Sequence, residues 1–444
     1  MTYRFAAIAA AAFSLLCASA AEASPVLLIS IDGLRPLDVI EADKRGIHVP
    51  HLRQLMADGS YAQGVRNSLP TVTYPNHTTI ITGVWPAVHG IANNVTFDPQ
   101  SRNAEGWYWY AEDIKVPTLW DKVHAAGGHT ASISWPVSVG ARSIDYDIPE
   151  YWRARNAEDL KLVRALSTPG LVDAAEKESG ATLAAAFGED AASDAARAKL
   201  AAAIYKLDRP TFFTLHLPSL DEAEHEYGPG SPEAIKNLEA VDGIVGDLVA
   251  SARAVEPDLV VVVVSDHGFA PLNTSINLTR AFVDAGLIDL DPKTGKVTRW
   301  KAAPWGGASA AIVLADPSDT ATAAQVRTLL DKLAADPANG IGKVIGRDEI
   351  AQLGGTADAS FWVDFQLGFS NGGGPTGPLR QPAPIKGTHG YFPTHPEMRA
   401  SFFAAGPGVP KGKALGDIDQ RDIAPTVATL LAVSWPNPGG KALF

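Results

Sequence analysis

Six side chains of the kinds that bind divalent metals stand at separated points of the chain. Three are carboxylates and three are imidazoles: Asp32, Asp221, His225, Asp266, His267 and His389. Oxygen and nitrogen donors of this mixture suit transition-metal dications, zinc above all, and the set is large enough for a pair of ions. Two neighbouring ions can stabilise both the attacking and the leaving oxygen of a phosphoryl displacement. The set therefore predicts a two-metal hydrolytic site.

Each of these residues also has a simpler interpretation when it is taken alone. Asp32 precedes a glycine, and an Asp-Gly pair is a common turn. Asp221 and His225 lie in an acidic stretch that a solvated loop would explain. His267 and His389 are each followed by glycine and would suit a strand end or a loop. The metal-site interpretation rests on the whole set and on its order along the chain.

A threonine with the potential to act as a nucleophile occurs in TVTYPNHTTIITG, residues 71–83. Pro75 at the first helical position and Gly83 just past the end predict a short helix. Thr73 would then stand at the helix entrance, where free N–H groups and the helix dipole favour an anion. Its hydroxyl would be either an N-cap or a nucleophile for a phosphate-like group.

The N-terminal residues and the cysteine count indicate the compartment. Residues 1–23 contain Arg4, an apolar run and two A-x-A cleavage motifs, which together indicate a secretory signal peptide. The single cysteine, Cys17, would leave with it, so a metal site must use histidines and carboxylates. Export without disulfides favours a periplasmic or secreted bacterial enzyme.

Charge and hydropathy exclude two classes of function. The net charge is −12 and no basic block occurs, so binding of duplex nucleic acid is not expected. The apolar run in residues 1–23 is shorter than the roughly 20 residues that span a bilayer, so no membrane span is expected. With 46% hydrophobic residues, the mature chain can build a large core.

Short apolar runs separate the candidate residues and predict buried strands. The runs cover residues 26–31, 130–135, 211–217, 259–264 and 400–405. Continuous runs of this kind are typical of strands buried on both faces, as in parallel sheets. Residues 232–256 and 423–433 have helical patterns, which predicts an α/β fold with a largely parallel central sheet flanked by helices. Such sheets bind ligands at the carboxyl ends of their strands, where Asp32, Asp221 and Asp266 would gather.

We expect residues 24–444 to form one catalytic domain with two insertions. Residues 138–205 are rich in alanine and charged residues, and we expect helices that cover the site. Residues 270–385 contain the signals SAAIVLAD, ATAAQVRTLLDKLAAD and GKVIGRDEIAQL, which predict a small inserted α+β subdomain.

Five blocks carry the candidate residues in order. They are LLISIDGLRP, TVTYPNHTTIITGVWPAVHGIANN, LDEAEHEYGPG, VVVVSDHGF and GTHGYFPTHPEMRASFFAAGPG, between residue 27 and about residue 408. Together they resemble the nucleotide pyrophosphatase/phosphodiesterase family, the type I phosphodiesterases of the alkaline phosphatase superfamily. The resemblance implies an alkaline-phosphatase-like core, two Zn²⁺ per chain, and a small phosphodiester or nucleotide as substrate.

The resemblance also implies a role for each matching residue. Thr73 would be the nucleophile and a ligand of one ion. The ion beside Thr73 would be held by Asp32, Asp266 and His267, and the second ion by Asp221, His225 and His389. Asn94 would donate its amide to a nonbridging phosphoryl oxygen, although an asparagine pair is also common in turns.

Three further side chains are candidate substrate contacts. By resemblance, Tyr74 would form a pocket wall that stacks on a nucleobase or similar group, and Trp135 would lie near the substrate. Both would also suit a buried core. The family's nucleotide-cleaving members often carry Tyr, Pro and Gly at the positions of His216, Leu220 and Glu224. Recognition of a nucleobase is therefore in question, and His216 would be either a substrate contact or buried structure.

The implied reaction has two steps and favours diesters. The Thr73 alkoxide would attack phosphorus, and water would then hydrolyse the phosphothreonine-type intermediate. No cationic clamp for a monoester dianion is evident in the matching blocks, although Arg35 stands near Asp32. A neutral amide such as Asn94 suits the single charge of a diester.

Three alternatives stay open. A phosphomonoesterase or phosphonate hydrolase would need a cation in residues 138–205, where Arg153, Arg155 and Lys161 are candidates. A sulfatase is disfavoured because threonine occupies the nucleophile position. A metal-binding protein without turnover would have no use for the hydroxyl of Thr73.

Overall fold

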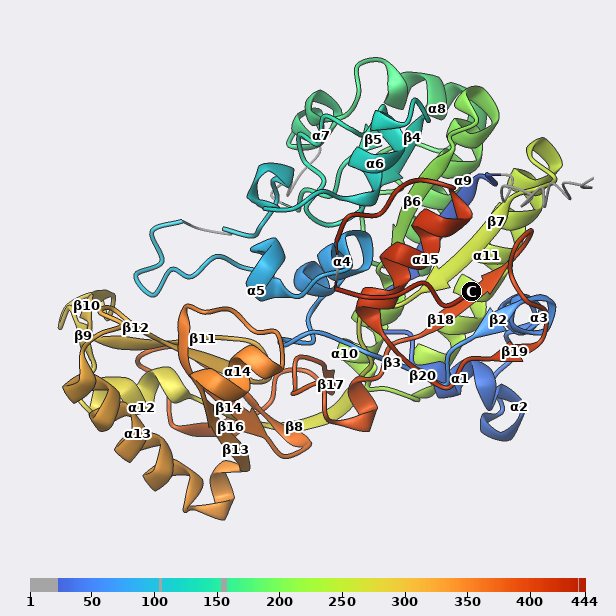
Figure 1. Cartoon of the computed structure of the whole chain (residues 1–444). Coiled ribbons are helices and arrows are strands. Elements are labelled where there is room, and N and C mark those ends of the chain that lie inside the picture. Colours follow the sequence, from blue (N-terminus) through green and yellow to red (C-terminus); the bar gives the residue numbers. More distant parts are fainter. Residues whose placement is uncertain (1–22, 104–105, 153–157, 438) are drawn as a thin grey trace, which may run out of the picture.

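The computed structural model describes residues 23–103, 106–152, 158–437 and 439–444 (Figure 1). The expected signal peptide lies outside these ranges except for its last residue. In the described part, no helix has both the length and the apolar character that are needed to cross a membrane.

The centre of the molecule is an eight-stranded sheet with the order β19-β2-β18-β7-β1-β6-β4-β5. Five strands run parallel: β7 (Val260–Val264), β1 (Val26–Ile31), β6 (Phe212–Leu217), β4 (Thr130–Ile133) and β5 (Tyr146–Ile148). The remaining three form the other edge: β18 (Phe402–Ala405), antiparallel to β7, with β2 (Ser60–Tyr61) and β19 (Lys413–Ala414). The prediction of a largely parallel sheet is confirmed.

Helices cover both faces of this sheet (Figure 1). One face carries α3 (Pro50–Asp58), α9 (Ala191–Asp208) and α11 (Pro232–Val255). The other carries α4 (Thr73–Thr82), α6 (Leu119–Ala125) and α15 (Ile423–Leu430). Successive side chains of a strand point to opposite faces, so Leu27 and Ile29 enter the first core while Val26 and Leu28 enter the second. Burial on both faces explains why these strands are continuous apolar runs.

We expect Ile29→Val to lower the free energy of unfolding by about 0.5–1.5 kcal/mol, because it removes one methylene group from the closed core. Ile29 is fully buried, whereas the control position Val88 on α5 (Pro86–His89) is 52% exposed. Val88→Ala should change the free energy by no more than about 0.5 kcal/mol. Denaturant unfolding monitored by circular dichroism would measure both, and equal effects would contradict the assignment of Ile29 to the core.

Residues 138–205 are only partly helical. They contain α7 (Leu160–Leu166), α8 (Leu171–Ser179) and α9, but also β5, which extends the main sheet beside β4. The strand expected at 130–135 ends at Ile133 because Ser134 adopts a left-handed backbone conformation with φ 54°.

Residues 270–385 form further sheets beside the main one, drawn in yellow to orange in Figure 1. One sheet contains β11 (Ala302–Trp305), β12 (Ala310–Leu314), β14 (Ala359–Phe365) and β13 (Ile341–Gly346). A second contains β15 (Gly368–Asn371), β8 (Ala270–Ile276) and β16 (Arg380–Pro382), with β17 (Gly387–Thr388) paired to β8. The remaining elements are α12 (Leu278–Asp284), β9 (Ile288–Leu290), β10 (Val297–Trp300), α13 (Thr320–Ala334) and α14 (Arg347–Gln352). These elements enclose a hydrophobic core of their own, and their interpretation as one inserted subdomain stays a prediction.

Candidate metal centre

The structure brings the six predicted ligands together near the carboxyl ends of the central strands. Asp32 follows β1, Asp266 and His267 follow β7, Asp221 and His225 lie on α10 (Ser219–Tyr227) after β6, and His389 follows β17. Gly33 supplies the turn after Asp32 with φ 74°, and its N–H donates to Asp266 Oδ1 over 3.3 Å. The turn and the metal-ligand interpretations of Asp32 are therefore compatible.

The first group of ligands is Asp221, His225 and His389, each of which offers one donor atom within 4.8 Å of the others. One turn of α10 separates Asp221 from His225, and their Oδ2 and Nε2 atoms lie 3.3 Å apart. His389 Nε2 lies 3.5 Å from Asp221 Oδ1. The stretch expected as a possible solvated loop is thus a helix that aims both side chains at one point.

Backbone carbonyls fix the orientation of these two histidines. His225 Nδ1 lies 3.0 Å from the Gly387 carbonyl, and His389 Nδ1 lies 3.1 Å from the Thr71 carbonyl. A carbonyl only accepts, so each Nδ1 carries a proton and donates. The opposite nitrogen, Nε2, then faces the cluster as a potential metal donor, which is the usual arrangement of metal-binding histidines.

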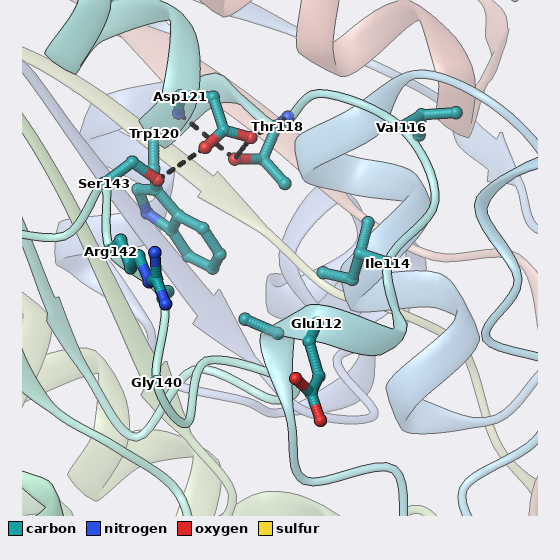
Figure 2. A pocket seen from close by; sticks show the side chains of 11 residues that line it. Glu112, Ile114, Val116, Thr118, Trp120, Asp121, Gly140, Arg142 and Ser143 are labelled. Atoms are coloured by element: carbon teal, nitrogen blue, oxygen red, sulfur yellow. Dashed lines mark hydrogen bonds between the residues drawn. The ribbon is translucent and has the colours of Figure 1, made fainter.

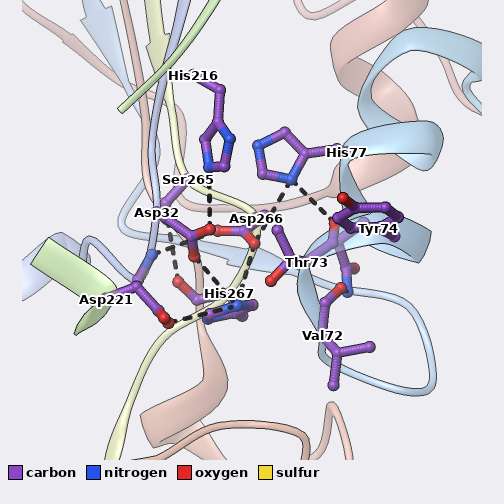
Figure 3. A network of polar contacts seen from close by, with 12 residues as sticks. Asp32, Val72, Thr73, Tyr74, His77, His216, Asp221, Ser265, Asp266 and His267 are labelled. Carbon is purple, nitrogen blue, oxygen red and sulfur yellow. Dashed lines mark hydrogen bonds and ion pairs between the residues drawn. The ribbon is translucent and has the colours of Figure 1, made fainter. Parts of the chain in front are cut away.

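The second group of donor atoms within 4.8 Å of one another is Asp32, Asp221 and His267, so Asp221 belongs to both groups, and Asp266 lies next to His267. His267 Nε2 lies 3.0 Å from Asp266 Oδ2 and 3.3 Å from Asp32 Oδ1. The same nitrogen is 4.0 Å from Asp221 Oδ1, and the rings of His267 and His389 stack with centroids 3.6 Å apart. The two groups are therefore adjacent parts of one centre. Figure 3 shows Asp221 of the first group beside Asp32, Asp266 and His267.

Several donor atoms in this centre are buried without a hydrogen-bond partner among the described residues. They are Asp32 Oδ1, Asp221 Oδ1, Asp266 Oδ2 and His267 Nε2. Buried polar atoms without hydrogen bonds are costly, and three carboxylate oxygens with an imidazole nitrogen at one place are a donor set for dications. The residues present fit the metal pair that the sequence predicts.

The pKa values show how strongly these groups interact before a cation is bound. Burial, Asp266 and Asp221 raise the pKa of Asp32 well above its ordinary value. Burial opposes the shift at His225, but Asp221 raises the pKa of that histidine to about 9. Burial and the neighbouring His267 lower the pKa of His389 to about 3. A dication between these carboxylates would relieve the repulsion that raises the pKa of Asp32.

Thr73 is the first residue of α4 and is not its N-cap. The capping position belongs to Val72, which is extended with φ −127° and makes no side-chain cap. The helix thus begins two residues before Pro75, and the N-cap interpretation of Thr73 is wrong. Figure 3 shows Thr73 beside Asp266 and His267, at the edge of the metal-ligand cluster. His77, one turn further along, has its Nδ1 2.9 Å from the Thr73 carbonyl and 3.6 Å from Asp266 Oδ2.

Asn94 is attached to the start of the same helix. Its Oδ1 accepts the backbone N–H of Tyr74 over 2.8 Å, so its amide NH₂ is the group left to donate. The neighbouring Asn93 instead donates its side-chain amide to the Gly306 carbonyl over 2.8 Å. This difference identifies Asn94 as the asparagine placed next to the nucleophile candidate.

A cleft of about 460 Å³ adjoins the centre and is lined by Asn94 and His389. Trp107, Ser275, Asn371 and Gln381 also line it. None of the described residues around it is Lys, Arg, Asp or Glu. The cleft therefore presents amides, hydroxyls, an indole and glycine backbone to a bound molecule.

The candidate cations lie elsewhere or outside the described residues. The Arg35 guanidinium pairs with Asp38 over 2.7 Å and lies 3.5 Å from Glu224 Oε1. Lys161 is exposed and pairs with Glu158. Arg153 and Arg155 fall in the segment that the structure does not describe. Neither Arg35 nor Lys161 lines the cleft.

The three expected substrate contacts are buried. Tyr74 is 1% exposed, packs edge-on against Trp107 with ring centroids 5.1 Å apart, and donates its hydroxyl to Glu150. Trp135 is fully buried and packs against His77. His216 is 2% exposed and faces Asp32. In this structure the three side chains are packed in the interior and do not line the cleft. Trp107 lines the cleft, which is the position that was expected for Tyr74.

Reasoning from the sequence missed Glu150 and Trp107. Glu150 comes two residues after β5, just as Asp32 follows β1, so a carboxylate at a strand end was an available signal. This signal was overlooked because helices, and no strand, were expected in residues 138–205. Trp107 has no such signal, because no pattern distinguishes it from the neighbouring aromatic residues.

A second cavity of about 390 Å³ lies next to α6 (Figure 2). Its lining includes Glu112, Arg142 and the capping pair Thr118 and Asp121, which bond to each other. Ser143 donates its hydroxyl to Asp121 Oδ1 over 2.7 Å. None of the predicted site residues lines this cavity, so it has no part in the candidate chemistry.

The comparison with known families agrees with this geometry. The sequence model of the type I phosphodiesterase / nucleotide pyrophosphatase family matches residues 26–391. The chain belongs to this family. The resemblance inferred from the five sequence blocks is thereby confirmed, and the ligand clusters lie within or at the boundary of the matched part.

Curated relatives of the family are similar over part of their length. Human ectonucleotide pyrophosphatase/phosphodiesterase family member 1 is 28% identical over 263 residues, which cover 57% of this chain and 24% of the relative. The venom phosphodiesterase CdcPDE of Crotalus durissus collilineatus is 26% identical over 276 residues, 58% of this chain and 28% of the relative. The chain thus matches about a quarter of the length of each.

Solved structures of family members share the fold. Human ectonucleotide pyrophosphatase/phosphodiesterase 5 superposes with a TM-score of 0.67 at 19% identity, covering 94% of this chain and 97% of the other. An inactive threonine-to-alanine variant of the murine protein in complex with AMP gives a TM-score of 0.65, also at 19% identity and with the same coverage. The α/β core is therefore that of the family's solved members.

Proposed function

We propose that this protein is an exported two-zinc phosphodiesterase or nucleotide pyrophosphatase that hydrolyses small phosphodiesters or phosphoanhydrides through a covalent intermediate on Thr73. The observation that carries the proposal is the position of Thr73 at the start of α4, beside a centre of unpaired buried donor atoms. Membership of the family supports the same reaction class.

The proposed division of the ligands between two ions is the one that the sequence resemblance implies. Asp32, Asp266 and His267 would hold the ion nearer to Thr73, and Asp221, His225 and His389 would hold the other. When bound, zinc would lower the pKa of the Thr73 hydroxyl and neutralise charge on the attacking and leaving oxygens.

The chain's own residues would then position the substrate and carry the bond changes. The Thr73 oxygen attacks phosphorus, and the bond from phosphorus to the leaving oxygen breaks as the alcohol or phosphate departs and takes up a proton. Asn94 donates its free amide to a nonbridging oxygen, while the dipole of α4 favours the anion. Water then attacks the phosphothreonine, releases the second product and restores the hydroxyl.

The neutral cleft favours diesters over monoesters. A diester carries one negative charge and an additional organic group, which the amides and Trp107 around the cleft would accommodate. A monoester dianion would lack a cationic partner among the described residues. A phosphomonoesterase or phosphonate hydrolase is the alternative, and it would require a cation from the undescribed segment 153–157.

The test is the initial rate of the zinc-loaded mature protein on three substrates. Bis-p-nitrophenyl phosphate and the p-nitrophenyl ester of thymidine monophosphate are diesters, and p-nitrophenyl phosphate is a monoester. The proposal expects both diesters to be hydrolysed faster. Faster monoester hydrolysis would support the phosphatase alternative, and zinc binding without turnover of any ester would indicate a metal-binding protein.

We expect Asn94→Ala to lower kcat/KM for diesters by about 10²–10³-fold, the usual cost of losing one donor to a developing oxyanion. Steady-state kinetics with bis-p-nitrophenyl phosphate would measure it, with the melting temperature as the control for folding. Unchanged kcat/KM would exclude Asn94 from contact with the phosphoryl group.

Export is proposed from the signal-like residues 1–23 and is compatible with the ectoenzyme names of the relatives. N-terminal sequencing of the protein recovered from the periplasm or medium of an expressing bacterium would test it. A new N-terminus near residue 24 is expected, and an uncleaved cytoplasmic product would contradict export.

A further inference from the structure

We infer that His216 is a positioning residue that holds one oxygen of Asp32 so that the other faces the metal. The inference rests on the proposed function, because it assigns Asp32 as a ligand.

Asp32 divides its two oxygens between different partners. Its Oδ2 lies 3.0 Å from His216 Nε2. Its Oδ1 is buried without a hydrogen bond and lies 3.3 Å from His267 Nε2, inside the centre. Asp32 is 3% exposed, so water does not compete for either oxygen. The contact with His216 therefore selects which oxygen is presented to a cation.

His216 is itself held from its other side. Its Nδ1 lies 2.8 Å from Glu150 Oε2 and 3.1 Å from the Ser134 carbonyl, and both of these groups are acceptors. Glu150 is 3% exposed, and its Oε1 accepts the Tyr74 hydroxyl over 2.7 Å. Since carboxylates and carbonyls lie at both ring nitrogens, His216 donates at both and cannot rotate without losing two contacts.

A turn with an unusual backbone conformation places the Ser134 carbonyl next to His216. Ser134 and Val137 adopt left-handed conformations with φ 54° and 60°, which are rare for residues other than glycine, above all for a β-branched one. The turn ends β4 and places the Ser134 carbonyl on the imidazole. The chain Tyr74–Glu150–His216–Asp32 thus links the helix that carries Thr73 with a candidate metal ligand. Figure 3 shows the last of these contacts, between His216 and Asp32.

Two substitutions separate positioning from simple space filling. In His216→Gln the amide can replace Nε2 and still donate to Asp32. In His216→Asn the shorter amide can replace Nδ1 and contact Glu150, but it leaves Asp32 Oδ2 without a donor. If His216 only filled space, the two variants would have the same zinc affinity.

The experiment is a zinc titration of the apo mature protein against a chromophoric chelator, which resolves two affinities. We expect His216→Asn to weaken one of the two sites about 10–100-fold, the usual cost of losing a hydrogen bond behind a metal ligand, while the other site is unchanged. His216→Gln should retain most of the affinity. His124→Asn serves as the control, because His124 pairs with Asp145 over 3.2 Å on the surface with its side chain 49% exposed.

Equal loss in His216→Asn and His216→Gln, or no loss in either, would overturn the inference. If His216→Asn does not fold, Glu150→Gln tests the same chain from its other end, and it should weaken the same single site by a smaller factor. Unchanged affinity in Glu150→Gln would then overturn it. A wild-type protein that binds no zinc would refute the proposed function as well, whereas two intact sites that ignore His216 would refute this inference alone.

Discussion

Replacement of Thr73 by alanine should lower the turnover of diesters by at least about 10³-fold, because the attacking oxygen itself is removed. The hydroxyl of Tyr74, the next residue of α4, donates to Glu150, and Thr73 is not needed as the helix cap. The fold should therefore survive, with an unchanged melting temperature of the apo protein. Initial rates with bis-p-nitrophenyl phosphate would measure the loss.

Thr73→Ser is the matched control for this prediction. It keeps an oxygen at the same position and removes only a methyl group, so it should retain far more activity than Thr73→Ala. Equal activity of the alanine variant and the wild type would show that water attacks phosphorus directly and that Thr73 has another role.

Removal of the metals should abolish activity and also destabilise the fold. Without cations, the buried carboxylate of Asp32 faces those of Asp266 and Asp221, and burial together with these two neighbours raises its pKa. Zinc that binds only the native state stabilises it by about 4 kcal/mol per site when its concentration is a thousand times Kd. Dialysis against a chelator, followed by calorimetry with and without added zinc, would measure both effects.

The pH dependence of zinc binding follows from the same groups. His225 must lose a proton from Nε2 to bind a metal, and Asp221 raises the pKa of this histidine to about 9 in the apo protein, although burial opposes the shift. Below pH 9 protons therefore compete with zinc, and the affinity of the protein for zinc should rise as the pH increases toward 9.

Activity that survives dialysis against a chelator, together with an unchanged melting temperature, would contradict a metal centre.

The sequence predicted the parts of the fold that depend on local pattern. The bounds of strand β1 and helix α11 were predicted to within one residue. An apolar run buried on two faces and a capped amphipathic helix can both be recognised from consecutive residues of the sequence. The start of α4 was misplaced, since Pro75 is tolerated at the third helical position as well as at the first. The end of β4 was also misplaced, because no local pattern predicts the left-handed conformation of Ser134, whose carbonyl lies 3.1 Å from His216 Nδ1.

At the site, residue type and strand-end position were enough to predict which ligands lie together. They were not enough to predict the directions in which the neighbouring side chains point. Asp32 and Asp266 follow strands whose order in the sheet places them side by side. Whether Tyr74 faces the cleft or the core depends on Glu150, a partner 76 residues away, and no local pattern contains that information. The substrate contacts were therefore the least predictable part.

The stereochemical course at phosphorus tests directly whether Thr73 forms a covalent intermediate. A diester made chiral by sulfur at one nonbridging position would be hydrolysed by the zinc-loaded protein in ¹⁸O-labelled water, and the configuration of the product determined by phosphorus NMR. Attack by Thr73 followed by attack of water inverts the centre twice, so the account predicts net retention. Net inversion would mean a single displacement by water and would contradict the covalent role of Thr73.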